Sequence, residues 1–67
     1  MITESYQIEV NGLPVDVVRK DIKNMHLGVY PPQGRVRVAA PLAMDDEAVR
    51  LAVIGKLGWI KRQQGRF

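Results

Sequence analysis

The residues best suited to acid–base chemistry are three consecutive acids, Asp45, Asp46 and Glu47. Adjacent side chains diverge around the start of a helix, so these carboxylates do not form the facing pair that general acid–base catalysis needs. They do suit a helix N-terminus, with Asp45 as the N-cap and the next two acids beside the positive end of the helix dipole. We therefore interpret them as a helix start.

Other catalytic and metal-binding patterns do not occur in the sequence. The single histidine, His26, has neither a second histidine nor a cysteine to complete a four-coordinate zinc site. No serine or threonine stands in a nucleophile motif. Gly12, Gly28 and Gly34 occupy turn or strand positions and form no phosphate-binding loop. We expect no catalytic residue, metal ligand or bound cofactor in this chain.

Basic residues give a stronger functional signal. Ten Lys and Arg residues exceed seven Asp and Glu residues, for a net charge of +3 and a pI of about 9.7. Cations beside aromatic rings on an exposed sheet face are typical of proteins that bind single-stranded nucleic acid. Solvated strand faces also carry such residues, so a role in solubility alone stays open. The candidate anion-binding residues are Arg19, Lys20, Lys23, Arg35 and Arg37, with His26 and Tyr30 as neighbours of the last two.

Length and composition restrict the class of protein. A chain of 67 residues forms one small domain with a thin margin of stability. It contains no cysteine, no apolar run long enough to span a membrane and no basic and then hydrophobic leader, so we expect a cytoplasmic protein without membrane contact. The end of the chain at Phe67, just past a predicted helix, favours residues 1–67 as the N-terminal fragment of a longer protein.

The first 41 residues predict four strands, because apolar and polar side chains alternate in four segments. Asn11-Gly12 predicts a tight hairpin turn, residues 19–23 a polar bend and residues 31–34 a second turn. The apolar faces are Tyr6, Ile8 and Val10; Leu13, Val15 and Val17; Met25, Leu27 and Val29; and Val36, Val38 and Ala40. One sheet with one apolar face needs a second layer. The predicted fold is therefore α+β, a four-stranded antiparallel β-meander covered on one face by a C-terminal α-helix.

That helix is predicted from Asp46 to about Gln64. Its sheet-facing side is formed by Val49, Ala52, Val53, Leu57, Trp59 and Ile60. Leu51 and Ile54 lie on the opposite side, beside Gly55 and Gly58, where a surface helix is normally polar. Glycines inside a helix are costly and allow another backbone to approach closely. We interpret these four residues as a possible partner-docking strip, although isolated exposed Leu and Ile residues are also common.

The sequence resembles the N-terminal region of the YgjP-like predicted zinc-dependent metallopeptidases, which are related to the SprT-like proteins. The resemblance depends on K-N-M-H-L-G-V at residues 23–29, G-R-V-R-V-A-A-P at residues 34–41, the acids that begin the helix, and K-L-G-W-I at residues 56–60. It implies that the zinc and its H-E-x-x-H helix belong to a C-terminal catalytic domain that this chain does not contain.

Three hypotheses follow. The resemblance implies a non-catalytic N-terminal module that scaffolds a metal-dependent hydrolase or shapes the approach of its substrate, with the missing catalytic domain as partner. The basic residues favour an autonomous nucleic-acid-binding module. The docking strip also suits a small homo-oligomerisation domain, although we expect the 67-residue chain itself to be a monomer.

Overall fold

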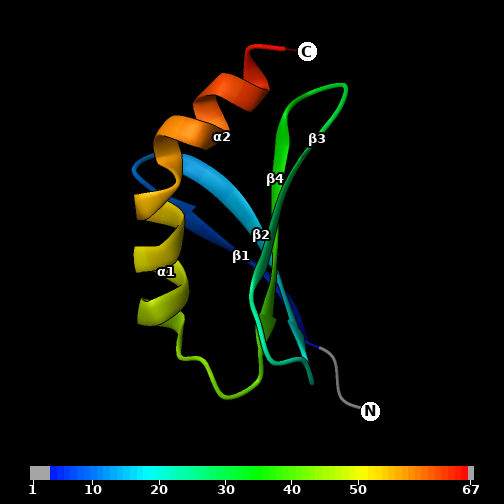
Figure 1. Ribbon diagram of the computed structural model, residues 1–67, viewed down its shortest axis with the longest axis vertical. Helices are drawn as coiled ribbons and strands as arrows, with labels where there is room; N and C mark the ends of the chain where they lie inside the picture. The colour runs from blue at the N-terminus through cyan, green and yellow to red at the C-terminus, as the bar shows by residue number, and fades with distance from the viewer. Residues whose placement is uncertain (1–3, 67) are drawn as a thin grey trace.

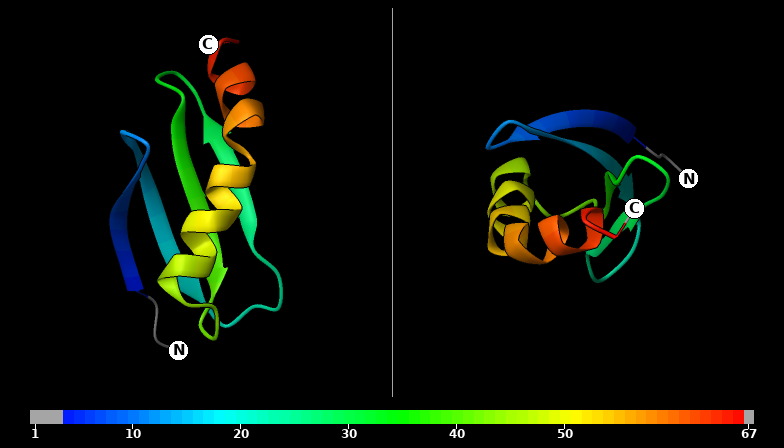
Figure 2. Two further views of the ribbon diagram at one scale, coloured as in Figure 1. Left: turned by 90° about the vertical axis from the view of Figure 1, so that its left-hand side faces the viewer. Right: turned by 90° about the horizontal axis from the view of Figure 1, so that it is seen from above.

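The computed structural model describes residues 4–66, which form one sheet and two helices in two layers (Figure 1). Both helices lie on the same face of the curved sheet, and the other face is uncovered (Figure 2). The elements in chain order are β1 (Glu4–Val10), β2 (Leu13–Lys20), β3 (His26–Tyr30), β4 (Arg35–Pro41), α1 (Asp46–Gly55) and α2 (Leu57–Gln64). Phe67 lies outside the described residues.

The β1–β2 hairpin confirms the turn that the sequence predicted. Asn11 and Gly12 have φ angles of 50° and 81°, and Val10 pairs with Leu13 across the turn. Two consecutive residues with positive φ match the right-handed twist of the flanking strands, which is why Asn-Gly suits this position.

The order of strands differs from the predicted meander. The sheet runs β1-β2-β4-β3, with β4 antiparallel to β3 but parallel to β2. The prediction of a purely antiparallel sheet was therefore wrong, although α+β was correct. The burial of the individual strands agrees with this order. Val36 and Val38 of β4 are almost completely buried, as a central strand requires, whereas Leu27 and Val29 of β3 are only half-buried at the edge.

The single predicted helix is also wrong, because the chain forms two helices that meet at Lys56. The Lys56 N–H donates to the Val53 carbonyl at 2.9 Å, a tighter step than the regular helical bond. Gly55 and Gly58 flank this step, and their low helix propensity makes the break inexpensive. The predicted N-cap is confirmed, since the Asp45 Oδ1 accepts from the Ala48 N–H at 2.8 Å.

The core lies between the covered face of the sheet and the inner sides of the helices. α1 contacts β1, and α2 contacts β3, so the helical layer runs diagonally across the strands (Figure 2). The fully buried apolar residues are Val10, Val15, Val17, Val36, Val38, Ala40, Val49, Val53 and Ile60.

Candidate functional site

Arg19, a predicted anion-binding residue, lies in the interior of the described structure and is only 6% exposed. It stands near the end of β2, beneath the loop that joins β4 to α1. Its Nη1 donates to the Pro41 carbonyl at 2.8 Å and to the Met44 carbonyl. Its Nη2 donates to the Asp46 Oδ1 at 2.7 Å, and its Nε donates to the Tyr6 hydroxyl at 3.0 Å. The guanidinium therefore anchors the loop to the sheet, and each of its three nitrogens donates to an acceptor within the chain.

The pKa values in this cluster indicate a structural role. Hydrogen bonds from Tyr6 and Arg19 lower the pKa of Asp46. Burial raises the pKa of Tyr6, as does its hydrogen bond to Asp46. Burial disfavours the charged form of Arg19, but its hydrogen bonds to Asp46 and Tyr6 outweigh this effect and raise its pKa. A general acid or base works best with a pKa near the operating pH, and these shifts all lead away from neutrality.

The remaining predicted anion-binding residues are exposed but do not form one cluster. Arg35 and Arg37 lie on the uncovered face of β4, opposite Tyr30 and Gly28 of β3. Lys20 is the last residue of β2, not part of a bend, and pairs with Pro41. Asp16 pairs with Arg37, and Lys20 is four residues further along β2. At the usual rise per residue, Lys20 is therefore about 13 Å along the sheet from Arg37. Lys23 is exposed in the connection between β2 and β3.

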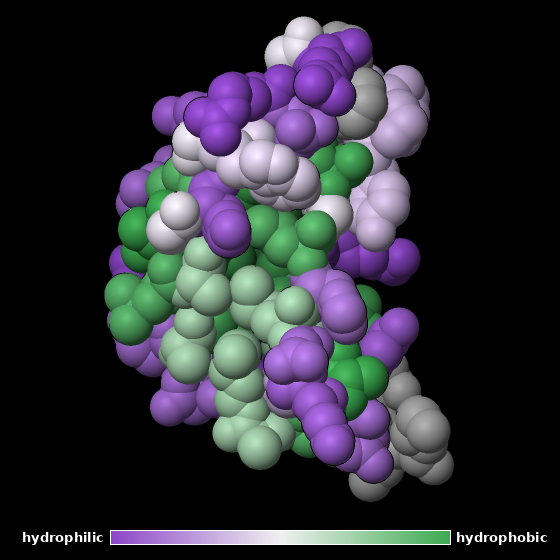
Figure 3. Space-filling view, in the orientation of Figure 1, coloured by the Kyte–Doolittle hydropathy of each residue, from purple (hydrophilic) through white to green (hydrophobic). Residues whose placement is uncertain are grey.

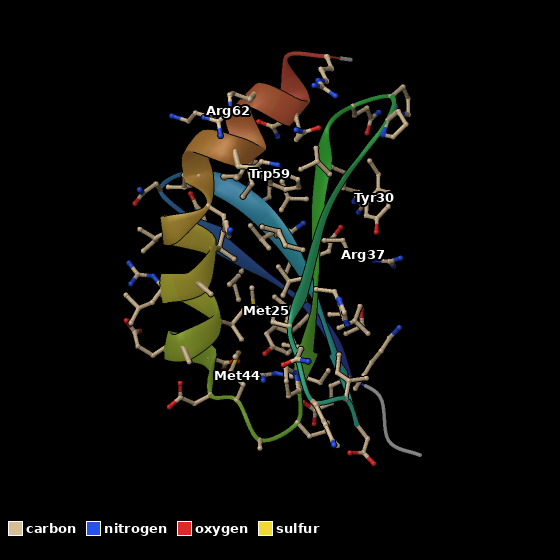
Figure 4. All side chains as sticks on the ribbon, viewed as in Figure 1. Met25, Tyr30, Arg37, Met44, Trp59 and Arg62 are labelled. Atoms are coloured by element: carbon tan, nitrogen blue, oxygen red, sulfur yellow. The ribbon has the colours of Figure 1, made fainter. Side chains whose placement is uncertain are left out.

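The uncovered face of the sheet has a shallow hollow of about 340 Å³, lined by Ser5, Asp16, Tyr30, Arg35 and Arg37. Tyr30 and Arg37 extend from the side of the sheet opposite the helices (Figure 4). The Arg35 Nε lies 2.5 Å from the Asp16 Oδ2, so an ion pair neutralises one of the two arginines. The hollow therefore combines one aromatic ring, one paired cation and Arg37.

The position of the Tyr30 ring depends on Gly28. A Cβ atom at Gly28 would lie 2.7 Å from the Tyr30 hydroxyl oxygen, so the ring lies over a residue that has no side chain. Sequence reasoning placed Arg35, Arg37 and Tyr30 near one another but missed Ser5 and Asp16. The alternation in β2 does place Asp16 on the outward face, but its contact with Arg35 needs the β2–β4 pairing, which the meander excluded.

The predicted docking strip lies on the outer side of the helices, with one exception. Leu51 is 57% exposed, and Gly55 and Gly58 are exposed. Ile54 is partly buried and packs against the core. Figure 3 shows apolar surface along the outer edge of α1, where a helix facing only water is normally polar.

Neither metal ligands nor a membrane-spanning helix were found in the described part of the chain. Within residues 4–66 no group of three or more His, Cys, Asp or Glu side chains is placed to hold a metal ion. His26, on β3, is exposed. The residues present therefore do not fit a zinc site. The described helices are too short to cross a bilayer.

Comparisons with known proteins leave the family undetermined. The chain matches no protein-family model, and no curated protein or solved structure is significantly similar to it.

Proposed function

We propose that this chain is a non-catalytic scaffold module that packs against the catalytic domain of a metal-dependent hydrolase, as the YgjP-like resemblance implies. The observation that carries the proposal is the pair of exposed glycines beside Leu51. A Cβ atom at Gly55 would meet nothing within 4 Å, and one at Gly58 would meet only the Arg62 Nη1, at 3.7 Å. The described fold therefore has room for a side chain at both positions, and its packing does not require glycine at either one.

Gly55 is the last residue of α1 and Gly58 lies in the first turn of α2, where glycine costs at most about 1 kcal/mol relative to alanine. Neither Gly55 nor Gly58 has the positive φ that would require glycine. Two such costs in a domain of 67 residues are substantial, because its total stability is about 3–10 kcal/mol. Close approach of another backbone to the helix junction at Lys56 would offset them. Leu51, one turn before Gly55 on the exposed side, would bury its apolar side chain in the same contact.

The test is complementation in trans. The 67-residue chain is co-expressed with the catalytic part of a YgjP-like protein from which the N-terminal region has been removed. The expected result is co-purification of the two chains and a gain in zinc-dependent hydrolysis. Absence of a complex at micromolar concentrations, with both chains folded, would contradict the proposal.

Three variants sharpen the test. Gly55→Ala is expected to raise the free energy of unfolding of the isolated chain by up to about 1 kcal/mol, because alanine is the better helix former. The same variant is expected to weaken the complex, because its methyl group enters the contact. Leu51→Glu is expected to abolish the complex, whereas Arg50→Gln, on the exposed part of the same helix, serves as the matched control. A concentration-dependent mass of the isolated chain that Leu51→Glu removes would favour the homo-oligomer instead.

A second candidate function, binding of single-stranded nucleic acid, is favoured by the hollow that contains Tyr30 and Arg37. Tyr30 is 51% exposed and could stack on a base while Arg37 contacts a phosphate. The nearby carboxylate of Asp16 opposes this function, because it pairs with Arg35 and repels phosphate. An NMR titration with short oligonucleotides at low and moderate salt tests it. Binding that weakens with salt and is lost in Arg37→Gln is the expected result for this function.

A further inference from the structure

The strand β3 forms a free edge of the sheet. It is the last strand in the order β1-β2-β4-β3, and no other strand among residues 4–66 pairs with its outer side. An edge strand presents unpaired backbone N–H and C=O groups that can pair with another chain, and proteins usually protect such edges with charged side chains or proline. Residues His26–Tyr30 contain no lysine, acid or proline, whereas the opposite edge, β1, carries Glu4 and Glu9.

A hollow of about 180 Å³ lies next to this edge, lined by Leu27, Lys56 and Trp59. Two of its three lining side chains are apolar, so the hollow suits an aliphatic side chain. Trp59 is 36% exposed, and Leu27 is half-buried on the helix-facing side of β3. Figure 3 shows apolar surface between the helices and β3, and Figure 4 shows Trp59 on this side of the sheet, away from Tyr30 and Arg37.

The segments that form and flank this edge contain no acids, although Asp16 of β2 reaches Arg35 on the uncovered face of the sheet. All seven acids lie in residues 4–21 and 45–47, so residues 22–44 and 48–66 contain no Asp or Glu. Those two acid-free segments contribute β3, β4, most of α1 and all of α2. Their basic residues are Lys23, Arg35, Arg37, Arg50, Lys56, Lys61, Arg62 and Arg66. A second copy of the chain would bring like charges together at this edge, whereas an acidic segment would complement them.

We propose that β3 accepts an extended acidic segment of another protein as a fifth strand of the sheet. The backbone of that segment pairs with residues 26–30. One of its apolar side chains enters the hollow between Leu27 and Trp59, and a carboxylate two residues away lies beside Lys56. Side chains two residues apart share one face of a strand and are separated by about 7 Å, so both contacts arise from the same face of the added strand.

The probe is a capped peptide of sequence TETLTET, which places Glu, Leu and Glu on one face of a strand and threonine on the other. It is titrated into the ¹⁵N-labelled 67-residue chain. The expected result is saturable shifts of the amides of residues 26–30 and of the Trp59 indole N–H. A version with lysine in place of both glutamates is expected to bind at least tenfold more weakly.

Two further comparisons separate strand addition from simple adhesion. N-methylation of one alternate set of peptide amides is expected to abolish binding, whereas methylation of the other set is tolerated, because only one edge of an added strand pairs with β3. Lys56→Glu is expected to weaken binding about fivefold, the range of one exposed charge contact, and Arg50→Glu on α1 is expected to leave it unchanged.

The proposal is overturned by any of three results. These are equal binding of the two methylated peptides, shifts confined to the Arg35 and Arg37 face, or no shifts at millimolar peptide. Peptide-independent dimerisation through β3 would also overturn it, because a second copy would then be the occupant.

Discussion

Replacing Arg19 by methionine tests whether its guanidinium holds the β4–α1 loop to the sheet. Methionine retains most of the apolar stem but removes every donor. The Pro41 and Met44 carbonyls then lose a hydrogen bond, at roughly 1 kcal/mol each. The ion pair with Asp46 adds little, since that carboxylate is 72% exposed and screened by water. We expect Arg19→Met to lower the free energy of unfolding by about 2–3 kcal/mol.

The assay is equilibrium unfolding in urea, followed by the fluorescence of Trp59, the only tryptophan of the chain. With a slope near 1 kcal/mol per molar urea, the midpoint is expected to fall by about 2–3 M. The matched control is Arg37→Met, because Arg37 is exposed on the uncovered face of the sheet and its replacement should change stability by less than about 0.5 kcal/mol. Equal midpoints for the two variants would refute the anchoring role of Arg19.

Three other variants test separate parts of the fold. Because the pKa of Asp46 is lowered in the folded state, its contribution to stability is present above pH 4 and is lost as the pH falls through the lowered value. Asp46→Asn should therefore flatten the acid limb of a plot of urea midpoint against pH, and an unchanged limb would contradict the role of the ion pair with Arg19. Gly34→Ala should destabilise the chain by about 1–2 kcal/mol in the same unfolding assay, since Gly34 has φ of 74° and a Cβ there would lie 2.9 Å from the Gln64 Cγ. Val38→Ala should cost about 2 kcal/mol, and a thermal midpoint like that of the wild type would exclude Val38 from the packed core.

The sequence alone determined the features that depend on neighbouring residues. Asn11-Gly12 specified a hairpin turn because few other pairs adopt two positive φ angles in succession. Alternation of apolar residues placed Val36 and Val38 on the buried face of their strand, and Asp45 marked the helix start. Each of these signals depends only on residues close in sequence, so each can be recognised without knowing the fold.

Tertiary structure decided which strands are neighbours. The order of the strands in turn decided which residues meet at the candidate sites. Alternation reveals the buried face of a strand but not its position in the sheet, because that position depends on how completely the whole sheet is covered. Insertion of β4 between β2 and β3 brought Asp16 to Arg35 and left β3 at the edge beside Trp59. The β4–α1 loop covers Arg19, which the sequence grouped with exposed cations. From sequence alone, a charged side chain on a strand is expected to face water. Arg19 is buried because other residues accept its hydrogen bonds, and these residues lie up to 27 positions away in the sequence.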